Sequence, residues 1–337
     1  MARDEATDAG RRLIGPHLPL ASGLLRAAER ARQIGATAMQ IFTDNPTAWR
    51  RRSELPAEVD EFRRRLAEAA VGPLAVHAPY LVNLCGPNET FWSQSVATMA
   101  NELRVGARYG ASFVVMHIGS HGGAGREHGI RRLVEGIAAV LDAAALHRTA
   151  LDGAVPEPVD ASLLPRLVLE NAAGMGDGIG ASIEDLADIL TAAESAGLAL
   201  DRLGVCLDTA HLWGAGYDVA SETGVHRLVE RVDTLLGRSN VVMVHLNDSR
   251  TVLGSRLDRH EHIAAGQLGV QGIRGVLDHP WLATLPTYLE TPGMDSGYDE
   301  INLERVRLLI AGETPPRLPA EAFTVRSSRE RSGPPKA

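Results

Sequence analysis

Short runs of apolar residues alternate along the chain with longer stretches in which apolar residues recur at helical spacing. Eight runs are rich in Val, Ile and Leu, and they cover residues 12–15, 37–42, 74–77, 113–117, 167–170, 204–207, 241–245 and 287–290. The helical stretches between them include residues 20–34, 57–70, 93–109, 130–146, 182–196 and 225–236. This alternation predicts repeated βα units around a parallel sheet, and eight such units close a (β/α)₈ TIM barrel of the α/β class.

Two segments interrupt the alternation and set the expected limits of the domain. Residues 149–165 contain Asp, Gly and three prolines, and we expect a surface insertion there, before the fifth strand. Residues 312–337 are rich in Pro, Ser and Arg and lack a repeating apolar face, which predicts a disordered tail. The prediction is a single barrel domain over residues 11–311, preceded by a flexible segment at residues 1–10.

Composition restricts the cellular setting and the kind of partner. With 45% hydrophobic and 23% charged residues, the chain resembles a soluble globular protein, and no apolar run approaches the roughly 20 residues that cross a bilayer. The first residues lack the apolar segment of a secretory signal, so we expect a cytoplasmic protein without a membrane partner. Two cysteines are too few for a disulfide framework or a cysteine zinc site. The formal charge of −8 argues against non-specific coating of nucleic acid but allows a local basic cleft.

The ends of the predicted strands, and the loops that follow them, carry histidines and carboxylates. In such a barrel these positions gather at one rim, where functional residues lie. The candidates are His77, His117, Glu170, Asp208, His211, His245, Asp258, His260 and Glu290. Without a cation, such a cluster would desolvate like charges together, at a cost of roughly several kcal/mol per ion. This set of ligands suits Zn²⁺, with Mn²⁺ or Fe²⁺ as alternatives, and is too large for one tetrahedral site.

Taken singly, these residues have simpler structural explanations. A histidine at a strand end is commonly a satisfied structural residue, and a buried glutamate commonly pairs with an arginine. Asp208 followed by His211 is also the pattern of a helix N-cap beside a histidine. It is their combination on one rim that favours a metal centre.

Seven segments resemble the endonuclease IV family, in the order in which that family has them. They are residues 24–50, HAPYLVNL from His77, HIGSH from His117, LENAAG from Leu169, VCLDTAH from Val205, HLND from His245 and GSRLDRH from Gly254. A strand end at Leu289-Glu290-Thr291 follows them. The resemblance covers most of the chain, from about Gly15 to Glu290, and its segments fall at strand ends, which makes it specific.

The resemblance implies a zinc-dependent apurinic/apyrimidinic endonuclease of base excision repair, acting as a monomer near the nucleoid. Its substrate would be duplex DNA with an abasic site, cut on the 5′ side to leave a 3′-hydroxyl and a 5′-deoxyribose phosphate. The resemblance assigns one zinc ion to His77, His117 and Glu170, a second to Glu170, Asp208, His245 and Glu290, and a third to His211, Asp258 and His260. Glu170, Asp208 and Glu290 would be the catalytic carboxylates.

Recognition of a lesion inside a duplex requires extrusion of the damaged nucleotide. Tyr80 and Leu81 are the candidates that would wedge into the gap, although an aromatic and a leucine after a strand also suit a core. Arg256 and Arg259 are candidate phosphate contacts. The arginines at residues 50–52 could also contact phosphates, but they equally suit a solvated helix flank.

The sequence departs from the family in the loops expected to meet DNA. Thr47 stands where a basic residue commonly fills the space left by the flipped nucleotide, and Asp44 also replaces a commonly basic residue. Residues 264–267 lack an acidic residue before their glycine. These differences leave the metal ligands intact and bear on DNA affinity and lesion range.

A metal-dependent sugar isomerase or epimerase is the alternative function. Such enzymes share this barrel and place Glu, Asp, His and Glu at strand ends around one or two divalent ions. The four residues assigned to the second zinc ion would serve either enzyme. The two histidines assigned to the first zinc ion and all three residues assigned to the third have no use in a sugar enzyme, so they favour the nuclease. A third reading, an inactive metal-binding or DNA-binding module, is opposed by the complete ligand set.

Overall fold

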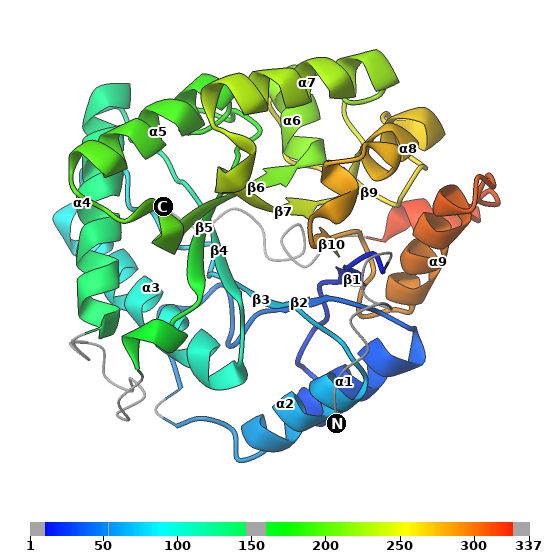
Figure 1. Ribbon diagram of the computed structural model, residues 1–337, viewed down its shortest axis with the longest axis horizontal. Coiled ribbons are helices and arrows are strands. Elements are labelled where there is room, and N and C mark those ends of the chain that lie inside the picture. The colour runs from blue at the N-terminus through cyan, green and yellow to red at the C-terminus, as the bar shows by residue number, and fades with distance from the viewer. Residues whose placement is uncertain (1–10, 53, 146–159, 326–337) are drawn as a thin grey trace.

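Eight parallel strands lie at the centre of the molecule, and helices surround them (Figure 1). The computed structural model describes residues 11–52, 54–145 and 160–325. The barrel strands are Ile14–Pro16 (β1), Met39–Ile41 (β2), Leu74–His77 (β3), Phe113–His117 (β4), Arg166–Glu170 (β5), Leu203–Asp208 (β6), Val241–His245 (β7) and Thr287–Leu289 (β10). Each predicted strand overlaps one of these, so the prediction of a (β/α)₈ barrel is confirmed.

The helices follow the strands in the expected alternation. They are Leu24–Gln33 (α1), Val59–Glu68 (α2), Glu89–Tyr109 (α3), Arg126–Ala145 (α4), Ile183–Ser195 (α5), Thr209–Ala215 (α6), Glu222–Leu235 (α7), Gly269–Asp278 (α8) and Tyr298–Ile310 (α9). A two-stranded antiparallel hairpin, formed by Asp248–Ser249 (β8) and His260–Glu261 (β9), follows β7. Within the described ranges, no helix is long and apolar enough to cross a membrane.

The strands pair in the order β1-β10-β7-β6-β5-β4-β3-β2, and every pair of neighbours is parallel. The two ends of this series, β1 and β2, meet through a parallel bridge between His17 and Gln40. At this seam the Leu18 amide donates a hydrogen bond of 2.8 Å to the Gln40 carbonyl oxygen. The bridge brings the first two strands together and closes the barrel.

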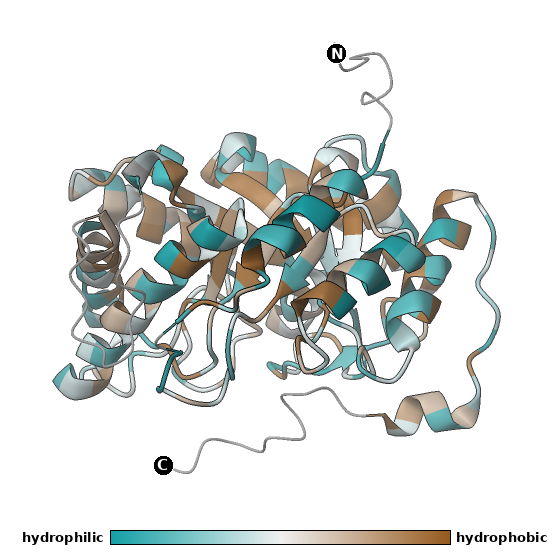
Figure 2. Cartoon of the chain, turned by 90° about the horizontal axis from the view of Figure 1, so that it is seen from below, coloured by the Kyte–Doolittle hydropathy of each residue, from teal (hydrophilic) through white to brown (hydrophobic). Residues whose placement is uncertain are grey.

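The alternation of side chains along each strand creates two apolar layers. Residues that point into the barrel form one small cluster, which consists of Ala38, Ala75, Val115, Val168, Cys206, Met243 and Tyr288. Their neighbours along the strands, such as Val114 and Met116, face outward and pack beneath the helices. Hydrophilic residues lie on the outer faces of the helices (Figure 2).

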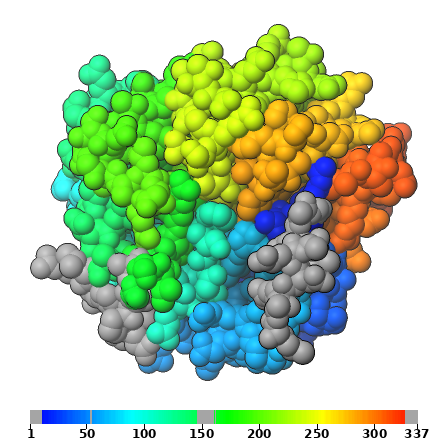
Figure 3. Space-filling view, viewed as in Figure 1, coloured from blue at the N-terminus to red at the C-terminus, as the bar shows by residue number. Residues whose placement is uncertain are grey.

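Side-chain contacts connect α1 to α9, and Figure 3 shows the early (blue) and late (orange-red) parts of the chain next to each other on one face. Arg30 of α1 donates two hydrogen bonds to the Asp299 carboxylate of α9, at 2.8 and 2.9 Å. Arg307 of α9 donates to the carbonyl oxygens of Ile34 and Gly35 at the end of α1, at 2.5 and 2.8 Å. These contacts join the first and last α-helices of the barrel on its outside.

The sequence predicted a disordered tail from residue 312, but the first part of this C-terminal segment is ordered. The structure describes it as far as Val325, and we refer to residues 312–325 as the strap. The strap contains a short 3₁₀ helix, Ala320–Thr324, in which Ala322 is fully buried. Arg305 donates a 2.6 Å hydrogen bond to the Pro316 carbonyl oxygen. Such contacts engage backbone carbonyl groups, which leave no periodic signal in the sequence.

Other expected boundaries fall partly or wholly outside the described residues. The flexible N-terminal segment at residues 1–10, residues 146–159 and the end of the tail at residues 326–337 are not described. The insertion is described only from Asp160, where a 3₁₀ turn at Ala161–Leu163 leads into β5.

Candidate metal centre

The nine residues predicted as metal ligands gather at the carboxyl-terminal rim of the barrel. Five are the last residues of their strands: His77, His117, Glu170, Asp208 and His245. Glu290 directly follows β10, and the others lie just beyond β6 and β7, as His211 in α6, His260 in β9 and Asp258 in the loop before β9. The barrel thus brings together residues that span the chain from β3 to β10.

Glu170 lies at the centre of this cluster and is almost completely buried. Its Oε2 atom lies 3.3 Å from Nε2 of His77 and 3.4 Å from Nε2 of His117. Its Oε1 atom lies 3.1 Å from Nδ1 of His245 and 3.3 Å from Nδ1 of His211. Each carboxylate oxygen therefore faces a different set of imidazoles, as a ligand shared between two cations requires.

A second group surrounds the imidazole of His245. The donor atoms of Glu170, Asp208, His245 and Glu290 all lie within 4.8 Å of one another. Nδ1 of His245 is 3.3 Å from Oε2 of Glu290 and 3.9 Å from Oδ2 of Asp208. Three carboxylates converge here on one nitrogen, so their mutual repulsion needs a cation to offset it.

A third group forms where α6 meets the β8–β9 hairpin. Donor atoms of Asp208, His211 and His260 lie within 4.8 Å of one another. Oδ1 of Asp258 lies 3.3 Å from Nε2 of His211 and 3.2 Å from Nε2 of His260. Asp208 therefore adjoins both the second and third groups, whereas the sequence had placed it in the second alone.

Hydrogen bonds to backbone carbonyl groups orient three of the imidazoles. Nδ1 of His77 donates to the carbonyl oxygen of Ala78 at 2.7 Å, and Nδ1 of His211 donates to that of Asn171 at 2.9 Å. Nδ1 of His260 donates to the carbonyl oxygen of Glu290 at 3.0 Å. Because a carbonyl oxygen can only accept, each Nδ1 carries a proton, which leaves Nε2 as the nitrogen that faces the cluster and can bind a cation.

Two asparagines that were given no role in the sequence form hydrogen bonds with Asp208 and Glu290. Asn247 donates a 2.7 Å hydrogen bond from Nδ2 to Oδ2 of Asp208, and its Oδ1 accepts from the amide of Glu290 at 2.8 Å. Oδ1 of Asn171 accepts from the Asp208 amide at 2.6 Å. Asn171 lies in LENAAG and Asn247 in HLND, two of the segments that resemble the family. This resemblance was the only feature of the sequence that could have indicated a role for them.

Several buried polar atoms of the cluster lack hydrogen bonds, which tests whether it fits metal ions. Within the described part of the chain, Oε2 of Glu170, Nε2 of His211 and Nε2 of His260 are buried without a hydrogen-bond partner. Nearly all buried polar atoms in folded proteins have such a partner. All three atoms point into the groups described above, so the residues present fit divalent cations.

Electrostatics leads to the same conclusion. Burial opposes ionisation of Glu170, but the nearby imidazoles of His245 and His117 hold its pKa well below the ordinary value. Burial also disfavours the charged form of His211, yet Asp208 and Asp258 raise its pKa well above the ordinary value. The cluster without cations therefore retains protons to balance its carboxylates, and divalent cations would displace those protons.

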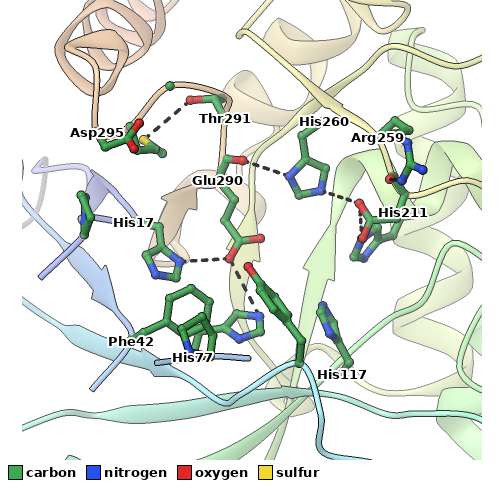
Figure 4. Close-up of a pocket in the computed structure, with 16 residues that line it drawn as sticks. His17, Phe42, His77, His117, His211, Arg259, His260, Glu290, Thr291 and Asp295 are labelled. Carbon is green, nitrogen blue, oxygen red and sulfur yellow. Dashed lines mark hydrogen bonds and ion pairs between the residues drawn. The ribbon is translucent and has the colours of Figure 1, made fainter. Parts of the chain in front are cut away.

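A pocket of about 180 Å³ opens over the cluster (Figure 4). Glu290 reaches into it between the imidazoles of His17 and His77, and the ring of Phe42 contacts both imidazoles, with 4.4 and 5.3 Å between ring centroids. The ring of Tyr80 forms part of the wall and stacks on His117, with 6.0 Å between ring centroids and 14° between planes. The pocket thus offers an aromatic wall beside a dense group of ligands.

Comparisons with known proteins identify the family. A family model described as the xylose isomerase-like TIM barrel matches residues 28–309. The probable endonuclease 4 of Halothermothrix orenii is 35% identical over 295 residues, which cover 87% of this chain and 99% of that protein. The chain belongs to the endonuclease IV family.

Solved structures separate this family from others that share its barrel. Endonuclease IV from Thermus thermophilus matches with a TM-score of 0.74 and 35% identity, over 90% of this chain and 100% of that one. A D-tagatose 3-epimerase-like protein matches with a TM-score of 0.62 over 90% of this chain and 99% of that one, at only 15% identity. The second likeness shows the fold alone.

The candidate DNA contacts of this endonuclease IV family member lie in different environments. Tyr80 and Leu81 are both half-buried, and Tyr80 lines the pocket. Arg259 is exposed at the edge of the same pocket. Arg256 is exposed on a separate surface hollow beside the loop that follows β5. All four lie at or near the rim that carries the metal cluster.

Arg51 is not available to phosphates, in contrast to one reading of the sequence. Only 4% of its surface is exposed, and Nη1 lies 3.8 Å from Oε1 of the buried Glu102. It also donates hydrogen bonds to the carbonyl oxygens of Asn45 and Ala48. Arg51 therefore fixes the loop after β2 from within, whereas its two neighbours, Arg50 and Arg52, are exposed.

Proposed function

We propose that the chain is a zinc-dependent apurinic/apyrimidinic endonuclease. It hydrolyses the phosphodiester on the 5′ side of an abasic site in duplex DNA, as a monomer, and leaves a 3′-hydroxyl and a 5′-deoxyribose phosphate. The observation that carries the proposal is the position of Glu170, whose two carboxylate oxygens face separate groups of imidazoles at 3.1 to 3.4 Å.

Three groups of side chains would hold three zinc ions. They are His77, His117 and Glu170; Glu170, Asp208, His245 and Glu290; and His211, Asp258 and His260. When bound, divalent ions supply a nucleophile from water at neutral pH and neutralise charge on phosphoryl oxygens. No side-chain nucleophile is required.

The remaining tasks fall to residues around the cluster. Tyr80 presents its ring beside His117, where it can stack on the nucleotide or sugar next to the cut phosphate. Arg259 places a positive charge at the mouth of the pocket, where a phosphate of the duplex can pair with it. Carbonyl bonds to three of the histidines hold the ligand nitrogens in place before the substrate arrives.

Two measurements on the purified protein test this proposal. Metal analysis should give about three zinc ions per chain, and a duplex with a single abasic site should be cut on the 5′ side of the lesion. Extension of the product by a DNA polymerase would confirm the 3′-hydroxyl end. At most two ions per chain, together with an intact abasic duplex, would overturn the proposal.

Variants separate the metal centre from the rest of the barrel. His260→Ala should lower both zinc content and cleavage, since it removes one ligand of the third group. His226→Ala is the matched control because His226 lies exposed on α7, away from the rim. A chelator should abolish cleavage by the unmodified protein, and added zinc should restore it. Assays with aldose and ketose sugars on the same preparation would detect the alternative isomerase activity.

A further inference from the structure

Gln40 lies at the seam of the barrel, and its side chain connects three residues of the site. It is the middle residue of β2 and is completely buried. Its amide oxygen lies 3.0 Å from Nε2 of His245, and its amide nitrogen donates to Oε1 of Glu290 at 2.6 Å. The same nitrogen lies 3.0 Å from Nδ1 of His17. One neutral side chain therefore contacts two proposed ligands of the second zinc ion, His245 and Glu290, and also His17, which lines the pocket.

The contact with Glu290 fixes which end of the Gln40 amide faces each partner. A carboxylate only accepts hydrogen bonds, so the group 2.6 Å from Oε1 of Glu290 must be the amide nitrogen. The amide oxygen then faces His245 and accepts a proton from Nε2. With Nε2 engaged by Gln40, Nδ1 of His245 is the nitrogen that faces Glu170 and Glu290, at 3.1 and 3.3 Å, and the one that a cation between them can take.

His245 thus offers Nδ1 to a metal ion, whereas the other histidines of the cluster offer Nε2. His77, His211 and His260 carry their protons on Nδ1 because a backbone carbonyl oxygen accepts from it. For His245 the acceptor is a side chain from a distant strand. The orientation of this ligand consequently depends on a single replaceable residue.

The second hydrogen of the Gln40 amide has a comparable effect on His17. It points to Nδ1 of His17, which then accepts, so the proton of the imidazole lies on Nε2. Nδ1 is also 3.3 Å from Oε1 of Glu290, but its contact with the Gln40 amide is shorter, and a nitrogen that accepts from that amide cannot also donate to Glu290. Nε2 of His17 is buried and has no hydrogen-bond partner within the described part of the chain, and His17 lines the pocket.

We infer that Gln40 is a positioning residue of the metal centre, which sets the protonated nitrogen of both His245 and His17. It prepares Nδ1 of His245 to bind the second zinc ion. It also makes His17 a hydrogen-bond donor toward the pocket, where an oxygen of the bound sugar or phosphate can accept. The inference rests on the proposed function for the identity of the metal and the substrate, but its central element is the bond between Gln40 and His245.

Gln40→Met tests this inference because it keeps the length of the side chain and removes both hydrogen-bonding groups. The variant should still form the barrel, as judged by circular dichroism, and should bind one of its three zinc ions about 10- to 100-fold more weakly. Competition with a chromophoric chelator measures that affinity without any cleavage assay. Gln33→Met is the matched control, because Gln33 is exposed on α1 and bonds only to Glu29 among the described residues.

Nuclear magnetic resonance gives a readout that a merely structural role would not change. Long-range ¹H–¹⁵N spectra of the zinc-loaded protein should show His245 protonated on Nε2, with the signal assigned by its absence in His245→Ala. In Gln40→Met that pattern should be lost or broadened. Unchanged His245 signals and unchanged zinc affinity in Gln40→Met would overturn the inference. Neither measurement depends on cleavage of abasic DNA, so this outcome is distinct from a failure of the proposed function.

His17→Phe provides a second test in case Gln40→Met fails to fold. Phenylalanine preserves the contact with Phe42, whose ring centroid lies 4.4 Å from that of His17, and leaves the bond between Gln40 and His245 in place. Three zinc ions and an unchanged His245 spectrum are expected, with KM for the abasic duplex raised about tenfold. If His17→Phe instead lost zinc while KM stayed the same, the assignment of His17 as a donor to substrate would be wrong.

Discussion

The carbonyl oxygen of Ala322 lies 3.1 Å from Nε2 of His262, two positions beyond the proposed zinc ligand His260. Nearby, Arg250 donates a 2.9 Å hydrogen bond to the carbonyl oxygen of Val325. The strap therefore contacts residues directly next to both strands of the β8–β9 hairpin. That hairpin carries the ligands which complete the third group, so the strap supports one part of the metal centre from behind.

A chain that ends at Gly312 should retain the barrel but hold its third zinc ion more weakly. Each lost hydrogen bond contributes about 0.5–1.5 kcal/mol, so the hairpin becomes freer to move away from α6. Zinc per chain after dialysis against increasing chelator would fall from three toward two at lower chelator concentration than in the full chain. A chain ending at Val325 is the control and should behave as the full chain does. Equal zinc retention by both truncated chains would show that the strap has no such role.

Glu170→Gln should remove more metal than a change at any ligand of a single group. The shared carboxylate belongs to both the first and second groups, and an amide neither carries the charge nor bridges two cations. Zinc content should fall from three ions to about one, and cleavage of an abasic duplex should drop by at least about a hundredfold. Glu127→Gln, on the exposed surface of α4, should change neither quantity. Retention of three ions by Glu170→Gln would contradict a bridging role.

Glu102 should make the stability of the protein depend on pH in a defined direction. Burial raises the pKa of Glu102, against the opposing effects of the hydrogen bond from Thr43 and the charge of Arg51. Between the ordinary pKa of about 4.5 and the raised pKa, the folded state holds more protons than the unfolded state. The contribution of Glu102 to stability therefore falls as pH rises through that window, and the deficit persists above it.

Glu102→Gln removes this dependence and isolates it from the other titrating groups. Urea unfolding of zinc-free unmodified protein and variant, measured from pH 4 to pH 8, gives the difference in the free energy of unfolding. That difference should shift in favour of the variant as pH rises, by at most about 1.4 kcal/mol per pH unit, and then level off. A difference that stays constant over this range would mean that the pKa of Glu102 is close to its ordinary value.

Thr47→Arg should strengthen binding to an abasic duplex. Thr47 is exposed in the loop after β2, where its hydroxyl donates a 2.9 Å hydrogen bond to Oδ1 of Asn45. An arginine there adds one cation at the expected DNA surface, so the slope of log K against log salt should steepen by about one. Fluorescence anisotropy at several salt concentrations measures the slope. Thr234→Arg on the outer face of α7 adds the same charge away from the rim, and an equal gain there would indicate a non-specific effect.

The sequence predicted the barrel and the collection of ligands because both follow from local rules. Apolar runs of strand length mark β3 to β7, and the last residue of each is a histidine or a carboxylate. Parallel strands then place these ends on one rim without further information. Asp258 and His260 were candidates because they lie in the loop after the seventh strand, but their assignment to a third metal ion required the resemblance to a family, since no periodic pattern specifies the path of that loop.

The supporting residues could not be predicted because their roles depend on contacts across the barrel. Gln40 reads as an ordinary strand residue until β2 meets β1 and its amide comes within reach of His245. Arg51 reads as part of a solvated basic run, and only the fold places it against the buried Glu102 of α3. The order of the strap likewise comes from hydrogen bonds to backbone carbonyl groups, to which any residue type can contribute.

The bridge between His17 and Gln40 also has a consequence for the order of folding. His17 contacts Glu290, and the two residues are 273 positions apart in the chain. Contacts between such distant positions form late, after the local βα units, because closing a long loop costs conformational entropy. The second zinc group is complete only when Glu290, at the end of the last barrel strand β10, has come beside His245 at the end of β7. During synthesis, therefore, this group cannot form until nearly the whole barrel has left the ribosome, and uptake of its zinc ion would mark the end of folding.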